Sequence, residues 1–204
     1  QGSIYVDIYG NVSTGGIIAA AGQAWSGDNT ESLGGIHVKG DVTLSMHGGT
    51  VDSPTEDFGD GVHVTSSGIY GGARVGSENK AQGSFVADGS VNVYLGGSLK
   101  LNANVFTGGE ALNAGASILI KGGTNLVIDG ATLTASEALV GGARATFITG
   151  TSSVGSVAEV AGGSKVVMNA GTVGESSNPY ALTGIIGGGW ASGAGKSVVA
   201  YSSV

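Results

Sequence analysis

The chain has 204 residues, with 41 glycines, 2 prolines, no cysteine and only 11% charged residues. Because 41% of the residues are apolar and charges are few, the composition excludes a disordered chain, and the scarcity of proline excludes collagen. The net charge of −7 with scattered lysines and arginines excludes a basic stripe for nucleic acid, and the lack of a long apolar run excludes insertion into a membrane.

The N-terminal stretch QGSIYVDIYG begins directly with alternating apolar side chains and lacks the basic and apolar segments of a signal peptide. The C-terminal stretch VVAYSSV stops within a similar alternation. We therefore expect residues 1–204 to form a single repeat domain that belongs to a longer protein. The absence of cysteine is compatible with export from the cell.

One stretch recurs five times along the chain. It opens with a small polar or acidic residue, alternates apolar side chains, meets one or two glycines and returns to Val or Leu. Its copies start 38, 49, 34 and 40 residues apart, which is typical of a repeat array whose loops differ in length. In chain order the copies are SIYVDIYGNV from Ser3, DVTLSMHGGTV from Asp41, SVNVYLGGSL from Ser90, TNLVIDGATL from Thr124 and SKVVMNAGTV from Ser164.

Two further stretches complete each repeat. The second combines two apolar residues, a small residue or a pair of glycines, and a residue near alanine; its copies are GGIIAAAGQA, GIYGGARV, NVFTGGEAL, EALVGGARA and GIIGGGWAS. The third alternates two or three apolar residues before the next repeat; its copies are GGIHVKGD, GSFVADGS, ASILIKGGT, VAEVAGGS and SVVAYSSV. Each repeat therefore contains three short runs with the period-2 alternation of β-strands.

Strands this short cannot bury their apolar faces within one repeat, so we expect like strands of successive repeats to stack around a shared core. The predicted fold is all-β: a right-handed parallel β-helix, or β-solenoid, of about five coils with three short strands per coil. An antiparallel β-sandwich is the alternative, but it does not require the same register in every repeat. The side chains expected to point inward include Val42, Leu44, Met46, Val91, Val93, Leu95, Leu126, Ile128, Val166 and Met168.

The stretch IIGGGWASGAGKS at 185–197 ends like a phosphate-binding loop. However, Trp190 stands where that motif needs its first glycine, and the run after Lys196 alternates like a strand instead of opening a helix. We interpret the stretch as another copy of the double-glycine turn, in which glycine tolerates positive φ, and we expect no nucleotide or other cofactor.

Arg74 and Arg144 occupy the same position in two repeats, and Glu110 lies in the adjoining position of the repeat between them. Stacking would bring Glu110 near both arginines, and we interpret the three residues as a surface salt-bridge ladder on one outer face. β-Helical polysaccharide lyases and hydrolases also build their sites from acidic and basic groups. A carbohydrate-active enzyme that gathers Asp129, Glu110 and Arg144 is therefore the alternative.

The stretch VDSPTEDFGDG at 51–61 is the longest departure from the repeat and collects four carboxylates around one phenylalanine. It matches neither the EF-hand pattern nor the calcium-binding nonapeptide, and His37, His47 and His63 are irregularly spaced, so we expect no metal site. Insertions that project from a regular stack are where partner contacts usually lie. Trp25 and Trp190 follow corresponding turns in the first and last repeats, where they either pack or offer stacking surfaces to a sugar. The predicted ligand-binding residues are Asp52, Glu56, Asp57, Phe58, Asp60, Trp25 and Trp190, and no catalytic residue is predicted.

The stretches GIYGGARV, GGTV, GATL and AGTVG resemble the β-helical regions of bacterial surface adhesins, including autotransporter passengers. The resemblance covers nearly the whole chain and implies a non-catalytic, extracellular stalk on the bacterial cell surface that binds a host surface protein or glycan. It carries over no site residue, because that family has no fixed binding motif. A polysaccharide-degrading β-helix enzyme and a purely structural stalk remain the alternative functions.

Overall fold

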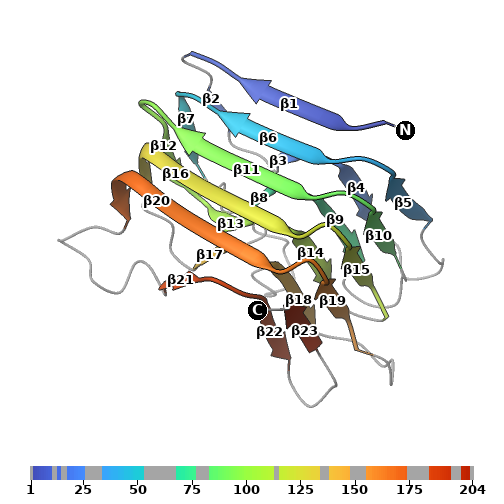
Figure 1. Cartoon of the computed structure of the whole chain (residues 1–204). Coiled ribbons are helices and arrows are strands. Elements are labelled where there is room, and N and C mark those ends of the chain that lie inside the picture. The colour runs from blue at the N-terminus through green and yellow to red at the C-terminus, as the bar shows by residue number, and fades with distance from the viewer. Residues whose placement is uncertain are drawn as a thin grey trace, which may run out of the picture.

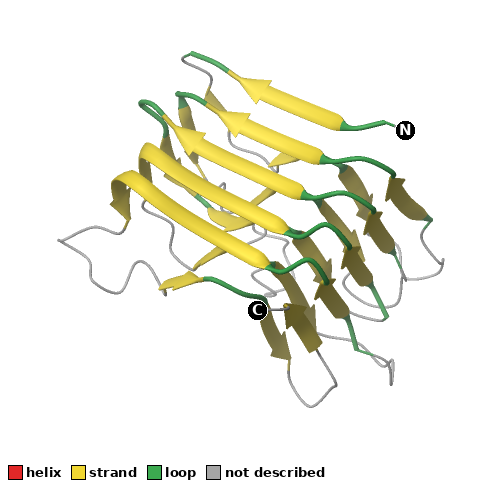
Figure 2. Ribbon diagram, in the orientation of Figure 1, coloured by secondary structure: helices red, strands yellow, loops and turns green. Residues whose placement is uncertain are grey.

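The computed structural model describes residues 2–10, 13–14, 18–25, 34–52, 68–76, 83–112, 115–133, 138–147, 155–173, 184–193 and 199–202. Within these ranges all regular structure is β-strand, and the strands form one eight-stranded and three five-stranded sheets (Figures 1 and 2). The pairings between the described strands are parallel, so the antiparallel sandwich is wrong. Parallel strands in curled sheets are what the β-solenoid class requires.

Sheet A, the eight-stranded sheet, is built from the first recurring stretch of each repeat. Its register holds through the stack, because Val6, Leu44, Val93, Leu126 and Val166 are successive partners. Its long strands lie side by side in Figure 1. They are β1 (Ile4–Ile8), β6 (Val42–Met46), β11 (Val91–Gly96), β16 (Thr124–Leu133) and β20 (Ser164–Val173), and the short strands β2 (Ser13–Thr14), β7 (Thr50–Asp52) and β12 (Lys100–Asn102) continue the sheet from the end of β16.

The other three sheets each take one strand from every repeat. Sheet B contains β3 (Ile18–Ala19), β8 (Gly68–Tyr70), β13 (Asn104–Phe106), β17 (Ala138–Val140) and β21 (Gly184–Ile186). Sheet C contains β4 (Gly22–Trp25), β9 (Ala73–Gly76), β14 (Gly109–Leu112), β18 (Ala143–Phe147) and β22 (Trp190–Gly193). Sheet D contains β5 (Gly35–Val38), β10 (Ser84–Ala87), β15 (Ser117–Ile120), β19 (Val157–Val160) and β23 (Val199–Ser202).

The repeats contain more strands than the three runs predicted from the sequence. In the second repeat the first run forms β6 and β7, and the second run forms β8 and β9 on either side of Gly71 and Gly72. The third run forms the single strand β10. The alternation of side chains identified the runs correctly, but it carries no information about where a run bends into a second strand.

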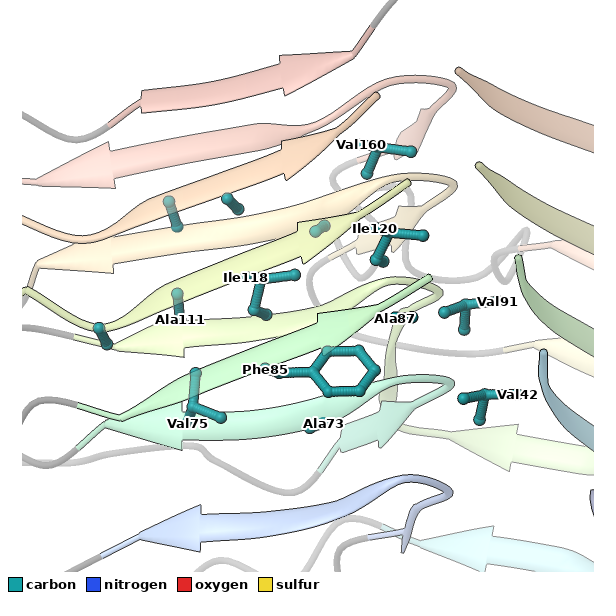
Figure 3. Close-up of a cluster of buried hydrophobic side chains, with 14 of the residues drawn as sticks. Val42, Ala73, Val75, Phe85, Ala87, Val91, Ala111, Ile118, Ile120 and Val160 are labelled. Atoms are coloured by element: carbon teal, nitrogen blue, oxygen red, sulfur yellow. The ribbon is translucent and has the colours of Figure 1, made fainter. Parts of the chain in front are cut away.

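Inward side chains of sheets A, C and D meet in one of the buried clusters (Figure 3). Val42, Val75 and Phe85 are each 0% exposed there, and the complete burial of a side chain of this size contributes about 1.5–3 kcal/mol. The predicted core residues of β6, β11 and β16 are confirmed, with exposures of 1% or less. Those of β20 are less buried, and Met168 is 43% exposed, because β20 pairs with a neighbour, β16, on one side only.

A column of glycines lets the backbones of successive repeats approach closely at the turn between sheets D and A. The amide of Gly122 donates to the carbonyl of Gly89 at 3.1 Å, and the amide of Gly89 donates to Gly40 at 3.3 Å. A Cβ atom built on Gly122 would lie 2.5 Å from the carbonyl carbon of Gly89, which is too close for any side chain. The spacing of the repeats at this turn therefore depends on glycine.

We predict that Gly122→Ala destabilises the fold by about 1–3 kcal/mol, because the added methyl group would force backbone apart from backbone. Gly34→Ala is the matched control, since a Cβ there meets nothing within 4 Å. Both substitutions restrict the unfolded chain equally, so the difference between their urea-unfolding free energies reports the collision alone. Equal stabilities of the two variants would contradict the close-approach argument.

Candidate functional site

The predicted ligand-binding loop leaves the stack at a defined corner. Strand β7 ends at Asp52 in sheet A, and β8 begins at Gly68 in sheet B. In the next repeat Ala103 alone joins the equivalent strands, and the register is the same on both sides, with Asp52 opposite Asn102 and Gly68 opposite Asn104. The stretch 53–67 is therefore an insertion that leaves the stack undisturbed. The predicted residues Glu56, Asp57, Phe58 and Asp60 lie outside the described residues.

The two predicted tryptophans do not occupy the same column. Trp25 ends β4 opposite Gly76, whereas Trp190 lies opposite Arg144 in the column that begins at Gln23. Trp190 is half-buried, and its ring centroid lies 4.6 Å from the guanidinium carbon of Arg144. Packing against Arg144 is thus a role that the structure gives to Trp190, while sugar stacking by either tryptophan stays a prediction.

Arg74, Glu110 and Arg144 meet as the sequence predicted, but they lie in the interior. Arg74 Nε donates to Glu110 Oε2 at 3.3 Å, and Arg144 Nη1 lies 3.4 Å from Glu110 Oε1. The side chains of Arg74 and Glu110 are 3% and 5% exposed, and that of Arg144 is 15% exposed. The expectation of a surface ladder is therefore wrong: one carboxylate joins two cations in a buried site spanning three repeats.

Aromatic rings line the same site on the neighbouring strands of sheet B. The Tyr70 hydroxyl donates to Glu110 Oε2 at 3.1 Å, and the Tyr70 ring stacks on Phe106 with centroids 5.5 Å apart. Arg144 lies over the Phe106 ring at 5.1 Å. The sequence reasoning missed Tyr70 and Phe106, although each stands four residues before its charged neighbour, across the glycine turn.

The double glycine explains why these outward side chains become buried. Ile69 packs in the sheet A core, so its neighbour Tyr70 points to the opposite side of the strand. A Cβ on Gly71 would collide with Val93 and one on Gly72 with Phe85, so the turn presses into the core where no side chain would fit. The chain bends there, and Tyr70 and Arg74 close on each other with 5.9 Å between the guanidinium carbon and the ring centroid.

The enzyme hypothesis required Asp129 to join Glu110 and Arg144, and the structure separates them. Asp129 lies in sheet A, where its Oδ2 accepts a hydrogen bond from the Tyr94 hydroxyl at 3.2 Å. Glu110 and Arg144 lie in sheet C. Both Glu110 oxygens already contact arginine, so the cluster is built as a structural link between repeats.

Two histidines find partners on outer faces, and His63 lies outside the described residues. His37 Nε2 and Lys121 Nζ lie 3.0 and 2.7 Å from the two oxygens of Asp88, and the hydrogen bonds from Lys121 and then His37 lower the Asp88 pKa. The His47 ring stacks on Tyr9 at 4.4 Å, and Tyr94 follows at 5.1 Å. Among the described residues, no three His, Asp or Glu side chains are placed to hold a metal ion.

Comparisons with protein-family models, with curated proteins and with solved structures found no match. In the part of the chain that the structure describes, there is no helix with the length and hydropathy needed to cross a membrane.

We predict that Glu110→Gln destabilises the fold by about 3–5 kcal/mol, because Arg74 and Arg144 would keep their buried charges without the carboxylate that joins them. Asp88→Asn is the control, since it removes an equivalent carboxylate between two cationic groups at an exposed position. We expect that control to change the unfolding free energy little. Similar losses in the two variants, measured by urea unfolding, would contradict a special role for the buried cluster.

We also predict a loss of stability at alkaline pH that depends on Tyr70. Burial, followed by the charge of Glu110, raises the Tyr70 pKa well above its ordinary value. The stability contributed by neutral Tyr70 is complete below the unfolded-state pKa of about 10 and is lost as the pH rises toward the folded-state pKa. The Tyr70→Phe variant should therefore show a flatter decline of unfolding free energy above about pH 10 than the unchanged chain. Circular dichroism during urea unfolding at several pH values measures this, and parallel curves would refute it.

Proposed function

We propose that this chain is a segment of a bacterial cell-surface adhesin: an extracellular, non-catalytic β-solenoid that presents an irregular loop to a host surface protein or glycan. The observation that carries the proposal is the insertion 53–67, which interrupts sheets A and B while the strands on both sides keep their register. A rigid stack that tolerates such an insertion can vary its binding loop without refolding.

We propose in addition that the solenoid is right-handed and has about five coils. Crossover connections between parallel strands of one sheet are right-handed in about 98% of cases. Sheets B, C and D each contain five strands, which matches one strand per repeat. Three sequence runs per repeat, with the first two bent at glycine, account for the strands observed.

The proposed contact residues combine carboxylates with one aromatic ring. Carboxylates accept hydrogen bonds from sugar hydroxyls or pair with basic side chains, and an aromatic ring adds apolar contact area. Trp25 and Trp190 are proposed as secondary contacts. The loop residues proposed as the primary contacts are Asp52, Glu56, Asp57, Phe58 and Asp60.

The test begins with a binding screen of the chain against mucins, immunoglobulins and matrix proteins, followed by a comparison of variants on whichever partner binds. Neutralising the four loop carboxylates and replacing Phe58 by Ala should weaken binding about tenfold or more, which corresponds to about 1.4 kcal/mol. A control with Asp7→Asn and Glu159→Gln changes exposed carboxylates on sheets A and D and should bind normally.

The screen also distinguishes the alternative functions. Unchanged adhesion after deletion of residues 52–60 would favour a purely structural stalk. Uniformly absent binding to all tested partners would count against the adhesin proposal itself. Cleavage of a polysaccharide would favour the enzyme hypothesis, although the separation of Asp129 from Glu110 removes the arrangement on which that hypothesis was based.

A further inference from the structure

We propose that the two ends of the strand stack are complementary and that a second copy of this chain docks head to tail, with its β20 edge against β1. Each of these strands pairs with a long neighbour on one side only, β1 with β6 and β20 with β16. A sheet edge offers a row of backbone donors and acceptors to another strand. This inference does not depend on the adhesin proposal.

The glycine column between sheets D and A indicates that backbone covers the β1 end. At Gly40, Gly89, Gly122 and Gly162, the missing Cβ would meet the backbone of the preceding repeat. Gly2 continues this column, since its carbonyl accepts from the Gly40 amide at 3.0 Å, yet a Cβ on Gly2 would meet nothing within 4 Å. Gly2 also has no positive φ that would require glycine. Its missing side chain is explained if a further strand layer lies there.

The double-glycine column gives the same indication for the opposite end. The missing Cβ atoms of Gly71 and Gly141 point toward the backbone of the following repeat, at Thr107 and Gly187. Gly187 is the last member of this column, and a Cβ there would meet nothing within 4 Å. The two open glycines face opposite directions along the stack. One head-to-tail contact therefore covers both of them.

The apolar columns continue across such a contact if the register of the stack is kept. Met168 and Ile185, which are 43% and 47% exposed, would lie beside Ile8 and Ile18 of the next copy. Side chains of these columns in the middle of the stack, such as Met46, are about 1% exposed. Docking thus removes apolar surface from water at both ends, which favours association.

The polar surface at the two ends also matches. Lys165 would lie next to Tyr5, whose side chain is 69% exposed, so that the ammonium group can contact the aromatic ring. A hollow of about 410 Å³ opens beside Gly162, Gly163 and Lys165, where the continued column would place Gly2 of the next copy. The contact joins different surfaces of the two copies, so it does not close and yields linear assemblies.

Sedimentation velocity across a range of protein concentrations tests the proposal. The unchanged chain should form larger species as its concentration rises. Met168→Lys and Ile185→Lys place a charge in the contact and should shift the chain to monomer. Val127→Lys is the matched control, because Val127 lies half-buried on the outer face of sheet A in the middle of the stack, and it should leave assembly unchanged. A monomeric unchanged chain at every concentration would overturn the proposal and leave these edges to strands of another protein.

Cysteine cross-linking determines the orientation, and the natural chain contributes no cysteine of its own. Adjacent strands place paired Cα atoms about 4.8 Å apart, within the range that a disulfide spans. Mixed Tyr5→Cys and Lys165→Cys chains should form a disulfide-linked dimer under mild oxidation. Neither variant alone should do so. A dimer formed by Tyr5→Cys alone would show head-to-head contact and overturn the proposal.

Discussion

Parallel hydrogen bonds between successive repeats hold equivalent residues about 4.8 Å apart, and this spacing governs what each position of a repeat can contain. Every side chain has a copy of its own position as its neighbour on both sides. Apolar positions therefore form continuous columns, as along Val6, Leu44 and Val93, and turns pressed against the next backbone form glycine columns, as along Gly40, Gly89 and Gly122. The repeats differ most where this neighbour rule does not apply, in the loops between strands.

The same spacing explains the arrangement of charge. Two like charges in neighbouring repeats would repel each other strongly in a buried position, so Arg74 and Arg144 are separated by Glu110. Burial makes this alternation a constraint on register, because a shift by one repeat would place the two arginines together. Asp88 between His37 and Lys121 follows the same rule at the surface, where water screens the charges and the constraint is weaker.

Sequence reasoning predicted the parts of the fold that depend on columns. The alternation in DVTLSMHGGTV and its copies identified the strands of sheet A and the inward residues Leu44, Val93 and Leu126, all of which are buried. It also predicted that Glu110 meets both arginines. It failed on their burial, because a column states which residues are neighbours along the stack but not how sharply the chain bends between columns. The bend at Gly71 and Gly72, which brings Tyr70 onto Arg74, arises from packing across the core.

The spacing rule also separates two directions in the molecule. Along the stack, each repeat must match its neighbours at every column, so the two ends are suited only to strands with the same sequence of columns. Across the stack, the chain leaves and re-enters at corners, where Ala103 alone and the stretch 53–67 connect equivalent strands without a change of register. Binding specificity can therefore vary in the corner loops while growth of the stack stays fixed by the columns. A change that alters the loop leaves the ends complementary, and a change that blocks an end leaves the loop in place.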